Sequence, residues 1–165
     1  MPKSEQVAFD VAALHDALDA ERRSRGMSWQ QVAAAIGNVN LSTLTGMRER
    51  ALEGDGVLQM LRWLRRPPEH FVRGTGPAMR AAATPLPEVG PGQILRFDAI
   101  RMHEALDARR IAQGLTWTEL ARVLEEPGPG LARLAKGGRV RMSQAVKIAA
   151  WLAQSISSFT RIASR

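Results

Sequence analysis

Apolar residues recur at helical spacing in two stretches that lie well apart in the sequence. The recurring positions, four residues apart within each stretch, are Leu14 and Leu18 in the first and Met102 and Leu106 in the second. This spacing is typical of one face of an amphipathic helix. Asp10 and Asp98 precede the two patterns and suit the N-cap position. Gly26 and Gly114 follow them, so the pattern predicts a first helix in each stretch that ends at the glycine.

A second helix is marked in both stretches by a capping box, in which Ser or Thr precedes Gln or Glu by three positions. The boxes run from Ser28 to Gln31 and from Thr116 to Glu119. A hydrophobic residue just before each box and another just after it can form a hydrophobic staple. These staple pairs are Met27 with Val32 and Leu115 with Leu120. The same signals occur in both stretches, so we expect the same local structure in each.

The later parts of both stretches also follow helical spacing. A short third helix is expected around 42–50 and 130–136. A fourth helix is expected to bury Val57, Leu58, Leu61 and Leu64 in the first stretch and Ala145, Ile148, Ala149 and Leu152 in the second. A short fifth helix is predicted at 69–73 and 157–161. No segment alternates with a period of two over a useful length, so the predicted fold class is all-α.

The two stretches are diverged copies of one unit. Residues 9–36 and 97–124 share eleven of 28 positions at an offset of 88 residues. All four tryptophans and all four phenylalanines fall into pairs at this offset: Trp29 with Trp117, Trp63 with Trp151, Phe9 with Phe97 and Phe71 with Phe159. We therefore predict two domains, 9–73 (the first copy) and 97–161 (the second copy). The segment 74–96, rich in Pro, Gly and Ala, is predicted to be a flexible linker.

The composition narrows the class of protein. Apolar residues make up 45% and charged residues 24% of the chain, which is typical of a globular protein. The absence of cysteine removes disulfides and thiolate sites and favours the cytoplasm. No apolar run approaches the roughly 20 residues of a membrane span, so no membrane partner is expected. The net charge of +7 favours a polyanionic partner, although arginine-rich chains are often basic without one.

Small, turn and apolar residues follow the two capping boxes at similar spacing. Ala33 and Ala121 lie where two helices would cross. The first copy continues with Gly37 in the turn and with Leu44 and Met47, whereas the second continues with Glu125 in the turn and with Leu131 and Leu134. This pattern resembles the lambda-repressor-like, or Xre, helix-turn-helix family. In that family the turn residue is glycine and the apolar pair follows six and nine residues later, so each copy departs from the pattern once.

The resemblance implies two helix-turn-helix domains of four to five short helices each, which bind duplex DNA through their third helices. Base edges would be contacted from the turn and from the first exposed positions of that helix. Carried onto this sequence, these positions are Asn38, Asn40, Ser42, Thr43, Thr45 and Arg48 in the first copy and Arg133 in the second. Phosphate contacts are expected from Gln30, Arg50, Lys136, Arg139 and Arg141.

The two copies differ in charge and in the chemistry of this surface. The first copy has a net charge of +1 and the second +4. The second copy offers Pro127, Gly128, Pro129 and Ala132 where the first offers amides and hydroxyls. We therefore expect base recognition mainly from the first copy and phosphate contacts mainly from the second. The expected function is a bacterial or phage-type transcriptional regulator, most simply a nucleoid-associated repressor, acting as an intramolecular pseudo-dimer or as a homodimer.

Other interpretations remain open. The alternative function is a protein-interaction module that docks another regulator or RNA polymerase, because the turn acids Glu125 and Glu126 would face phosphates. Asn38 and Asn40 are also common turn residues whatever the function. Arg139 and Arg141 would equally suit solvated loop positions.

The remaining candidate chemistry favours structural roles. Packing in the core is a better explanation of the four tryptophans than stacking on single-stranded nucleic acid, because they are duplicated at helical core positions. His15 and His103 each precede an aspartate by one turn, which suggests a His–Asp pair on the helix surface. No third ligand is near, so no metal is expected. No phosphate-binding glycine motif or nucleophile elbow is present, so neither a cofactor nor an enzymatic activity is predicted.

Overall fold

The computed structural model describes residues 7–74, 81 and 83–165. The first copy contains strand β1 (Ala8–Phe9), helices α1 (Val11–Ser24), α2 (Trp29–Ile36) and α3 (Leu41–Thr45), 3₁₀ helix η1 (Met47–Glu49), helix α4 (Gly54–Leu64), 3₁₀ helix η2 (Pro68–Phe71) and strand β2 (Val72–Arg73). The second copy contains strand β3 (Gln93–Phe97), helices α6 (Ala99–Ala112), α7 (Trp117–Leu124), α8 (Gly128–Leu134) and α9 (Met142–Leu152), 3₁₀ helix η3 (Ile156–Phe159) and strand β4 (Thr160–Ser164). Apart from η1, which has no counterpart between α8 and α9, the elements of the two copies therefore follow one another in the same order.

The helix ends form where the sequence signals predict them. Asp10 accepts a hydrogen bond from the amide of Ala13 at 2.9 Å, and Asp98 accepts one from the amide of Arg101 at 3.0 Å. Both predicted capping boxes are present, at the N-termini of α2 and α7. Each first helix ends just before its glycine, and Gly26 has a φ of 64°. A positive φ is accessible to glycine because it lacks a Cβ.

The fold is mostly helical, as expected, but it is not all-α. Strand β1 pairs antiparallel with β2, and β3 pairs antiparallel with β4. The predicted fifth helices form only as the single-turn helices η2 and η3, and each chain segment then continues as a strand. The pairs join residues more than 60 positions apart in sequence, and strands this short carry too little alternation to be recognised.

The segment expected to be a flexible linker contributes to the fold at its end. Residues 93–96 belong to strand β3, which lies against helix α4. The side chain of Gln59 donates to the carbonyl of Leu95 at 2.6 Å, and Asp55 accepts from the amide of Phe97 at 2.8 Å. The second copy therefore begins in direct contact with the first. Residues 75–80 and 82 of this segment lie outside the described residues.

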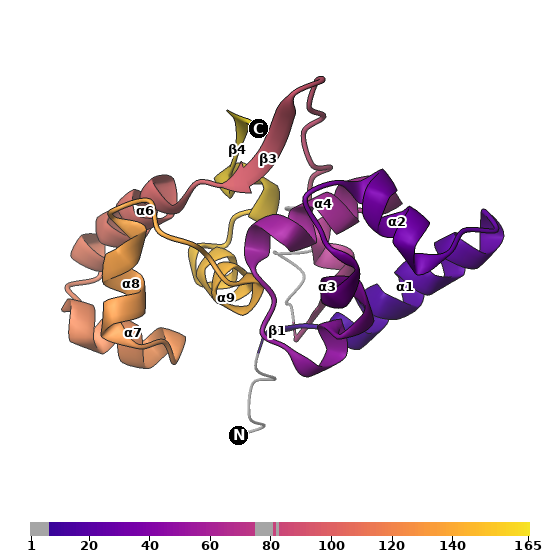
Figure 1. Ribbon diagram of the computed structural model, residues 1–165. Coiled ribbons are helices and arrows are strands. Elements are labelled where there is room, and N and C mark those ends of the chain that lie inside the picture. The colour runs from indigo at the N-terminus through magenta and orange to yellow at the C-terminus, as the bar shows by residue number, and fades with distance from the viewer. Residues whose placement is uncertain (1–6, 75–80, 82) are drawn as a thin grey trace.

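The two copies pack side by side around helices α4 and α9 (Figure 1). Glu53 and Arg141 lie opposite one another in an isolated antiparallel β-bridge. The offset of 88 residues relates these two positions, so equivalent backbone segments meet about a local pseudo-twofold axis. Buried residues from both copies form one hydrophobic cluster. The duplication has therefore produced a structure that resembles two subunits of a dimer within one chain.

The duplicated tryptophans at the starts of α2 and α7 pack between a histidine and an arginine. The Trp29 ring stacks on His15, with centroids 5.1 Å apart, and Arg22 lies over the same ring at 5.1 Å. In the second copy Trp117 has equivalent contacts with His103 and Arg110. In the described part of the chain no hydrogen bond joins either histidine to the aspartate expected as its partner, and each imidazole stacks on the indole of the second helix. The four tryptophans are all partly buried against the core.

Candidate nucleic-acid interface

A cleft of about 520 Å³ lies between the two copies beside helix α3. It brings together residues of the turn before α3, the segment before α4, strands β3 and β4 and the loop after α8. Five of its lining residues belong to the predicted DNA-contacting set: Asn38, Asn40, Thr43, Arg50 and Arg139. The fold therefore gathers on one concave surface candidate residues that come from both copies.

Asn40 has a clear structural role within this set. It is the N-cap of α3, and its Oδ1 accepts hydrogen bonds from the amide of Thr43 at 2.8 Å, from its hydroxyl at 2.7 Å and from the hydroxyl of Ser42 at 2.8 Å. Asn38 has a left-handed backbone with φ of 57°, a conformation that asparagine tolerates well. Both asparagines are exposed. The amide nitrogens of their side chains are the groups left to donate to a ligand.

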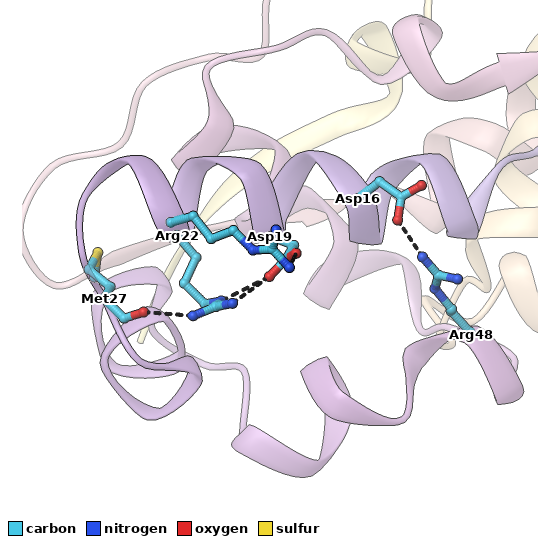
Figure 2. A network of polar contacts seen from close by, with 6 residues as sticks. Asp16, Asp19, Arg22, Met27 and Arg48 are labelled. Atoms are coloured by element: carbon cyan, nitrogen blue, oxygen red, sulfur yellow. Dashed lines mark hydrogen bonds and ion pairs between the residues drawn. The ribbon is translucent and has the colours of Figure 1, made fainter.

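Thr45 and Arg48 are also engaged within the first copy. The hydroxyl of Thr45 donates to the carbonyl of Leu41 at 3.1 Å. Arg48 forms an ion pair with Asp16 of helix α1, as Figure 2 shows. This ion pair holds the guanidinium against α1, and both side chains remain more than half exposed. The ion pair occupies Nη2 of Arg48, so release from Asp16 would free the whole guanidinium to contact a base or a phosphate.

A second ion-pair group in Figure 2 fixes the end of α1. Asp19 accepts hydrogen bonds from the Nε and Nη2 of Arg22, and Arg22 also donates to the carbonyl of Met27 at 3.1 Å. The Arg22 guanidinium lowers the pKa of the Asp19 carboxyl below its ordinary value. Arg22 thereby joins α1 to the start of α2, which positions the turn before α3 indirectly.

Most of the cations predicted to contact DNA in the second copy have no partner for their side chains among the described residues. Arg133, Lys136 and Arg141 are exposed, and none has an ion pair or hydrogen bond from its side chain within the described part of the chain. Arg139 is 86% exposed, with its Nε 3.7 Å from Glu53. Gln30 is exposed near the start of α2. The four cations of the second copy are therefore available to an anionic partner without first breaking strong contacts.

The turn before α8 repels phosphate less strongly than its two glutamates suggest. The ammonium of Lys147 lies 3.1 Å from Glu126 Oε1 and 3.2 Å from the carbonyl of Glu125. Glu126 is also largely buried. Glu125 adopts the left-handed conformation, with φ of 54°, at the position where the first copy has Gly37. The charge of Glu126 is thus balanced locally by a lysine of α9.

An apolar hollow of about 200 Å³ lies at the start of α8. Its lining combines the tryptophan and histidine of the stacked pair with small residues of α8: His103, Trp117, Thr118, Gly128, Leu131 and Ala132. Four large apolar side chains of the second copy that do not line this hollow are also exposed: Ile100 at 49%, Ile111 at 63%, Val123 at 55% and Ile162 at 47%. This end of the second copy therefore differs from the polar surface around α3.

Comparison with known proteins finds no protein similar to this chain. Neither a protein-family model, nor a curated protein, nor a solved structure matches this chain. The family resemblance of the α2–α3 and α7–α8 pairs therefore remains an expectation from the sequence. Among the residues that the structure describes, no helix is long and apolar enough to cross a membrane, and no group of three His, Asp or Glu side chains is arranged to hold a metal ion.

Three cationic residues near the first copy were missed by sequence reasoning. Arg96 and Arg161 line the cleft from strands β3 and β4. Arg165 lies beside the turn of the first copy, since a Cβ added to Gly37 would lie 3.1 Å from its Nη2. Neither 93–97 nor 160–164 alternates regularly between polar and apolar residues, so the sequence gives no local signal for these positions. Arg96 and Arg161 of strands β3 and β4, with Arg165 just after β4, therefore add positive charge from the second copy near the turn before α3 of the first.

Proposed function

We propose that the protein binds duplex DNA as a transcriptional regulator, with the surface around α3 contacting bases. The observation that carries this proposal is the cleft, which combines the amides and hydroxyls of the first copy with arginines from both copies. Amide and hydroxyl groups can recognise base edges in the major groove. Guanidinium groups bind phosphates and supply affinity without sequence information. The two kinds of group lie close enough to contact one duplex together.

The positions of the cations favour base contacts by the first copy and phosphate contacts by the second, with some of these phosphate contacts beside α3 of the first copy. Cations of the second copy occur around α8, and Arg96, Arg139 and Arg161 also lie beside α3 of the first copy. The second copy would therefore hold the phosphates that flank the bases contacted by the first. The pseudo-twofold contact at Glu53 and Arg141 would present both copies to DNA as a rigid intramolecular pseudo-dimer.

The experiment that tests this function is selection from a randomised duplex library with the full chain at two salt concentrations. Enrichment of a sequence motif is expected, and failure to enrich any motif at either salt concentration would contradict sequence-specific recognition. Lys136→Ala is expected to weaken binding to all sequences alike and to reduce the salt slope by about 1. Arg23→Ala is the matched control, because it removes the same charge from an exposed position of α1 outside the proposed interface.

A second candidate function applies to the second copy alone. The apolar hollow at the start of α8 favours docking of an apolar side chain of a protein partner. Ala132→Glu distinguishes the two roles, because it places a negative charge on the exposed face of α8. DNA affinity should fall about tenfold or more if α8 enters a groove. Unchanged affinity would show that α8 does not enter a groove and would leave its surface free for a partner.

A further inference from the structure

Two arginines face each other across the β3–β4 sheet. Arg96 and Arg161 are direct partners in the antiparallel register, so their side chains project from the same face of the sheet. Both line the cleft between the copies, and both are exposed. Like charges directly opposite one another destabilise an antiparallel pair. No carboxylate forms an ion pair with either of them within the described residues, so the repulsion is uncompensated in the protein alone.

The first copy lacks this arrangement. The position equivalent to Arg161 is Arg73, which lies opposite Ala8 in the β1–β2 register. Arg73 also has a partner carboxylate, since its Nε lies 3.7 Å from Asp10 Oδ2. The same sheet position therefore holds one paired arginine in the first copy and two unpaired arginines in the second. The second arginine of this pair is Arg96, and its equivalent in the first copy is Ala8.

The rest of the cleft adds further positive charge around this pair. Arg50 and Arg139 line the same cleft, opposed by two carboxylates, Glu53 and Asp55. Asp55 is already engaged by the amide of Phe97, and Glu53 lies 3.7 Å from Arg139. A volume of about 520 Å³ lies within the range of small-molecule sites. The cleft thus has the size and charge to hold an anion of two or more negative charges.

We propose that the Arg96–Arg161 pair binds phosphate groups in the cleft between the two copies. Guanidinium groups match phosphate oxygens through paired hydrogen bonds, so one phosphate can bridge two arginines and replace their repulsion by attraction. The phosphate belongs either to the backbone of a bound duplex or to a free phosphorylated compound. The proposal goes beyond the proposed function, because it holds whether or not the protein recognises a base sequence.

The test measures two ligands in buffers of matched ionic strength. Inorganic pyrophosphate is titrated calorimetrically, and a labelled duplex of random sequence is followed by fluorescence anisotropy. Arg96→Gln and Arg161→Gln each remove one cleft charge and keep most of the side chain. Each is expected to weaken binding of at least one ligand by about tenfold or more, the loss expected for a hydrogen bond to a charged group. Arg73→Gln, which removes the same charge from the equivalent position outside the cleft, should change binding less than about twofold.

The ligand that responds identifies the source of the phosphate. Loss of both activities, with pyrophosphate displacing the duplex, assigns the cleft to the DNA backbone. Loss of pyrophosphate binding alone assigns it to a free phosphorylated compound. The proposal is overturned if wild type binds neither ligand, or if Arg73→Gln weakens binding as much as the cleft variants. An enriched motif, with duplex affinity unchanged in both cleft variants and no pyrophosphate binding, would overturn the cleft proposal and keep the proposed function, whereas pyrophosphate binding that the cleft variants weaken, without any enriched motif, would do the reverse.

A measurement without ligand checks the repulsion itself. At low salt, Arg96→Gln should unfold at a temperature roughly 1–3 °C higher than wild type, because one of two opposed charges is gone. The difference should shrink as salt screens the pair. Arg73→Gln, which breaks an ion pair instead, should show no such gain. A stabilisation that does not depend on salt would show that the two guanidinium groups do not repel one another and would remove the basis of the proposal.

Discussion

Gly54 and Val140 join the two copies by a close backbone contact. The amide of Gly54 donates to the carbonyl of Val140 at 2.7 Å, and the equivalent amide of Met142 donates to the carbonyl of Leu52 at 3.0 Å. A Cβ added to Gly54 would lie 2.6 Å from the same carbonyl oxygen and 2.6 Å from two ring atoms of Phe97. The contact about the pseudo-twofold axis therefore depends on the absence of a side chain at one of two equivalent positions.

Gly54→Ala should destabilise the protein because its methyl group cannot fit between Phe97 and the backbone of the second copy. Overpacking of this kind costs roughly 1–3 kcal/mol. Thermal and denaturant unfolding would measure the loss. Since one buried cluster spans both copies, wild type should unfold in a single transition.

Gly56→Ala is the matched control for this variant. Gly56 lies in the same first turn of α4, and a Cβ there would meet nothing within 4 Å. Alanine should therefore stabilise the helix by about 0.5–1 kcal/mol. Equal effects of the two substitutions would contradict the close-contact explanation, because helix propensity alone would then account for both.

The duplication and the helix ends could be predicted because they depend on local signals. Asp10, Ser28 and Thr116 each bond to a backbone amide three residues away, so their roles are visible in sequence. The contact at Gly54 joins residues far apart in the chain, and the sequence shows only a glycine near a helix start. Strand β3 was missed for the same reason, since its five residues gain their partners from β4 and α4.

The candidate site was predictable only in part. A short helix, α3, forms near the expected range 42–50, and several polar side chains of this helix and of the turn before it line one cleft. Sequence reasoning could not find Arg96 and Arg161, because their proximity depends on the register of two strands. It also could not show that Arg48 is bound to Asp16, which lies 32 residues earlier. Long-range pairing decides which charges of the site are free.

Ala153→Gly is expected to stabilise the protein. Ala153 follows α9 with φ of 54° and ψ of 40°, a left-handed conformation that is strained for a residue with a Cβ. Glycine relieves this strain, but it also has greater conformational freedom in the unfolded chain. The net increase in the free energy of unfolding should be about 0.5–1 kcal/mol. Denaturant unfolding of the two proteins side by side measures the difference.

Ala135→Gly tests the same substitution where no strain exists. Ala135 is also an exposed residue at a helix end, but its φ of −61° is ordinary for alanine. Glycine should therefore lower stability there by about 0.5–1 kcal/mol. A gain at both positions, or a loss at both, would contradict the assignment of strain to Ala153.

Glu69 should make stability depend on pH. Its carboxyl is buried, its Oε1 accepts from the amide of Ile156 in the second copy at 2.8 Å, and its Oε2 has no hydrogen-bond partner among the described residues. Burial raises the pKa of Glu69 above its ordinary value of 4.5, although the Ile156 amide opposes this shift. The folded state therefore holds the proton more tightly, and the contribution of Glu69 to the free energy of unfolding falls as pH rises from 4.5 through the raised pKa.

Glu69→Gln keeps an oxygen acceptor for Ile156 and removes the ionisable group. The free energy of unfolding of this variant, relative to wild type, should increase as pH rises through that window. Urea unfolding at a series of pH values measures the difference. Glu88→Gln, at an exposed carboxyl, is the control and should give a difference that changes little with pH. A flat difference for Glu69→Gln would show that this carboxyl is not desolvated.

Asp16→Asn should strengthen DNA binding if the proposed function is correct. Asp16 holds Arg48 against α1, so the variant frees a guanidinium beside α3 and removes a negative charge from the same surface. An exposed ion pair contributes about 0–1 kcal/mol to folding, and stability should change little. Affinity for an enriched duplex should rise about two- to tenfold, with a steeper dependence on salt because one more phosphate contact becomes available.

Glu104→Gln separates this effect from a change in net charge. Glu104 is the equivalent of Asp16 in the second copy and is exposed on α6, with no ion pair among the described residues. Glu104→Gln changes the net charge by the same amount as Asp16→Asn but releases no arginine. Its effect on DNA affinity should therefore be smaller than that of Asp16→Asn. Fluorescence anisotropy at two salt concentrations compares the variants. If Asp16→Asn binds more weakly than wild type, then Arg48 acts in its paired position, and the ion pair belongs to the interface.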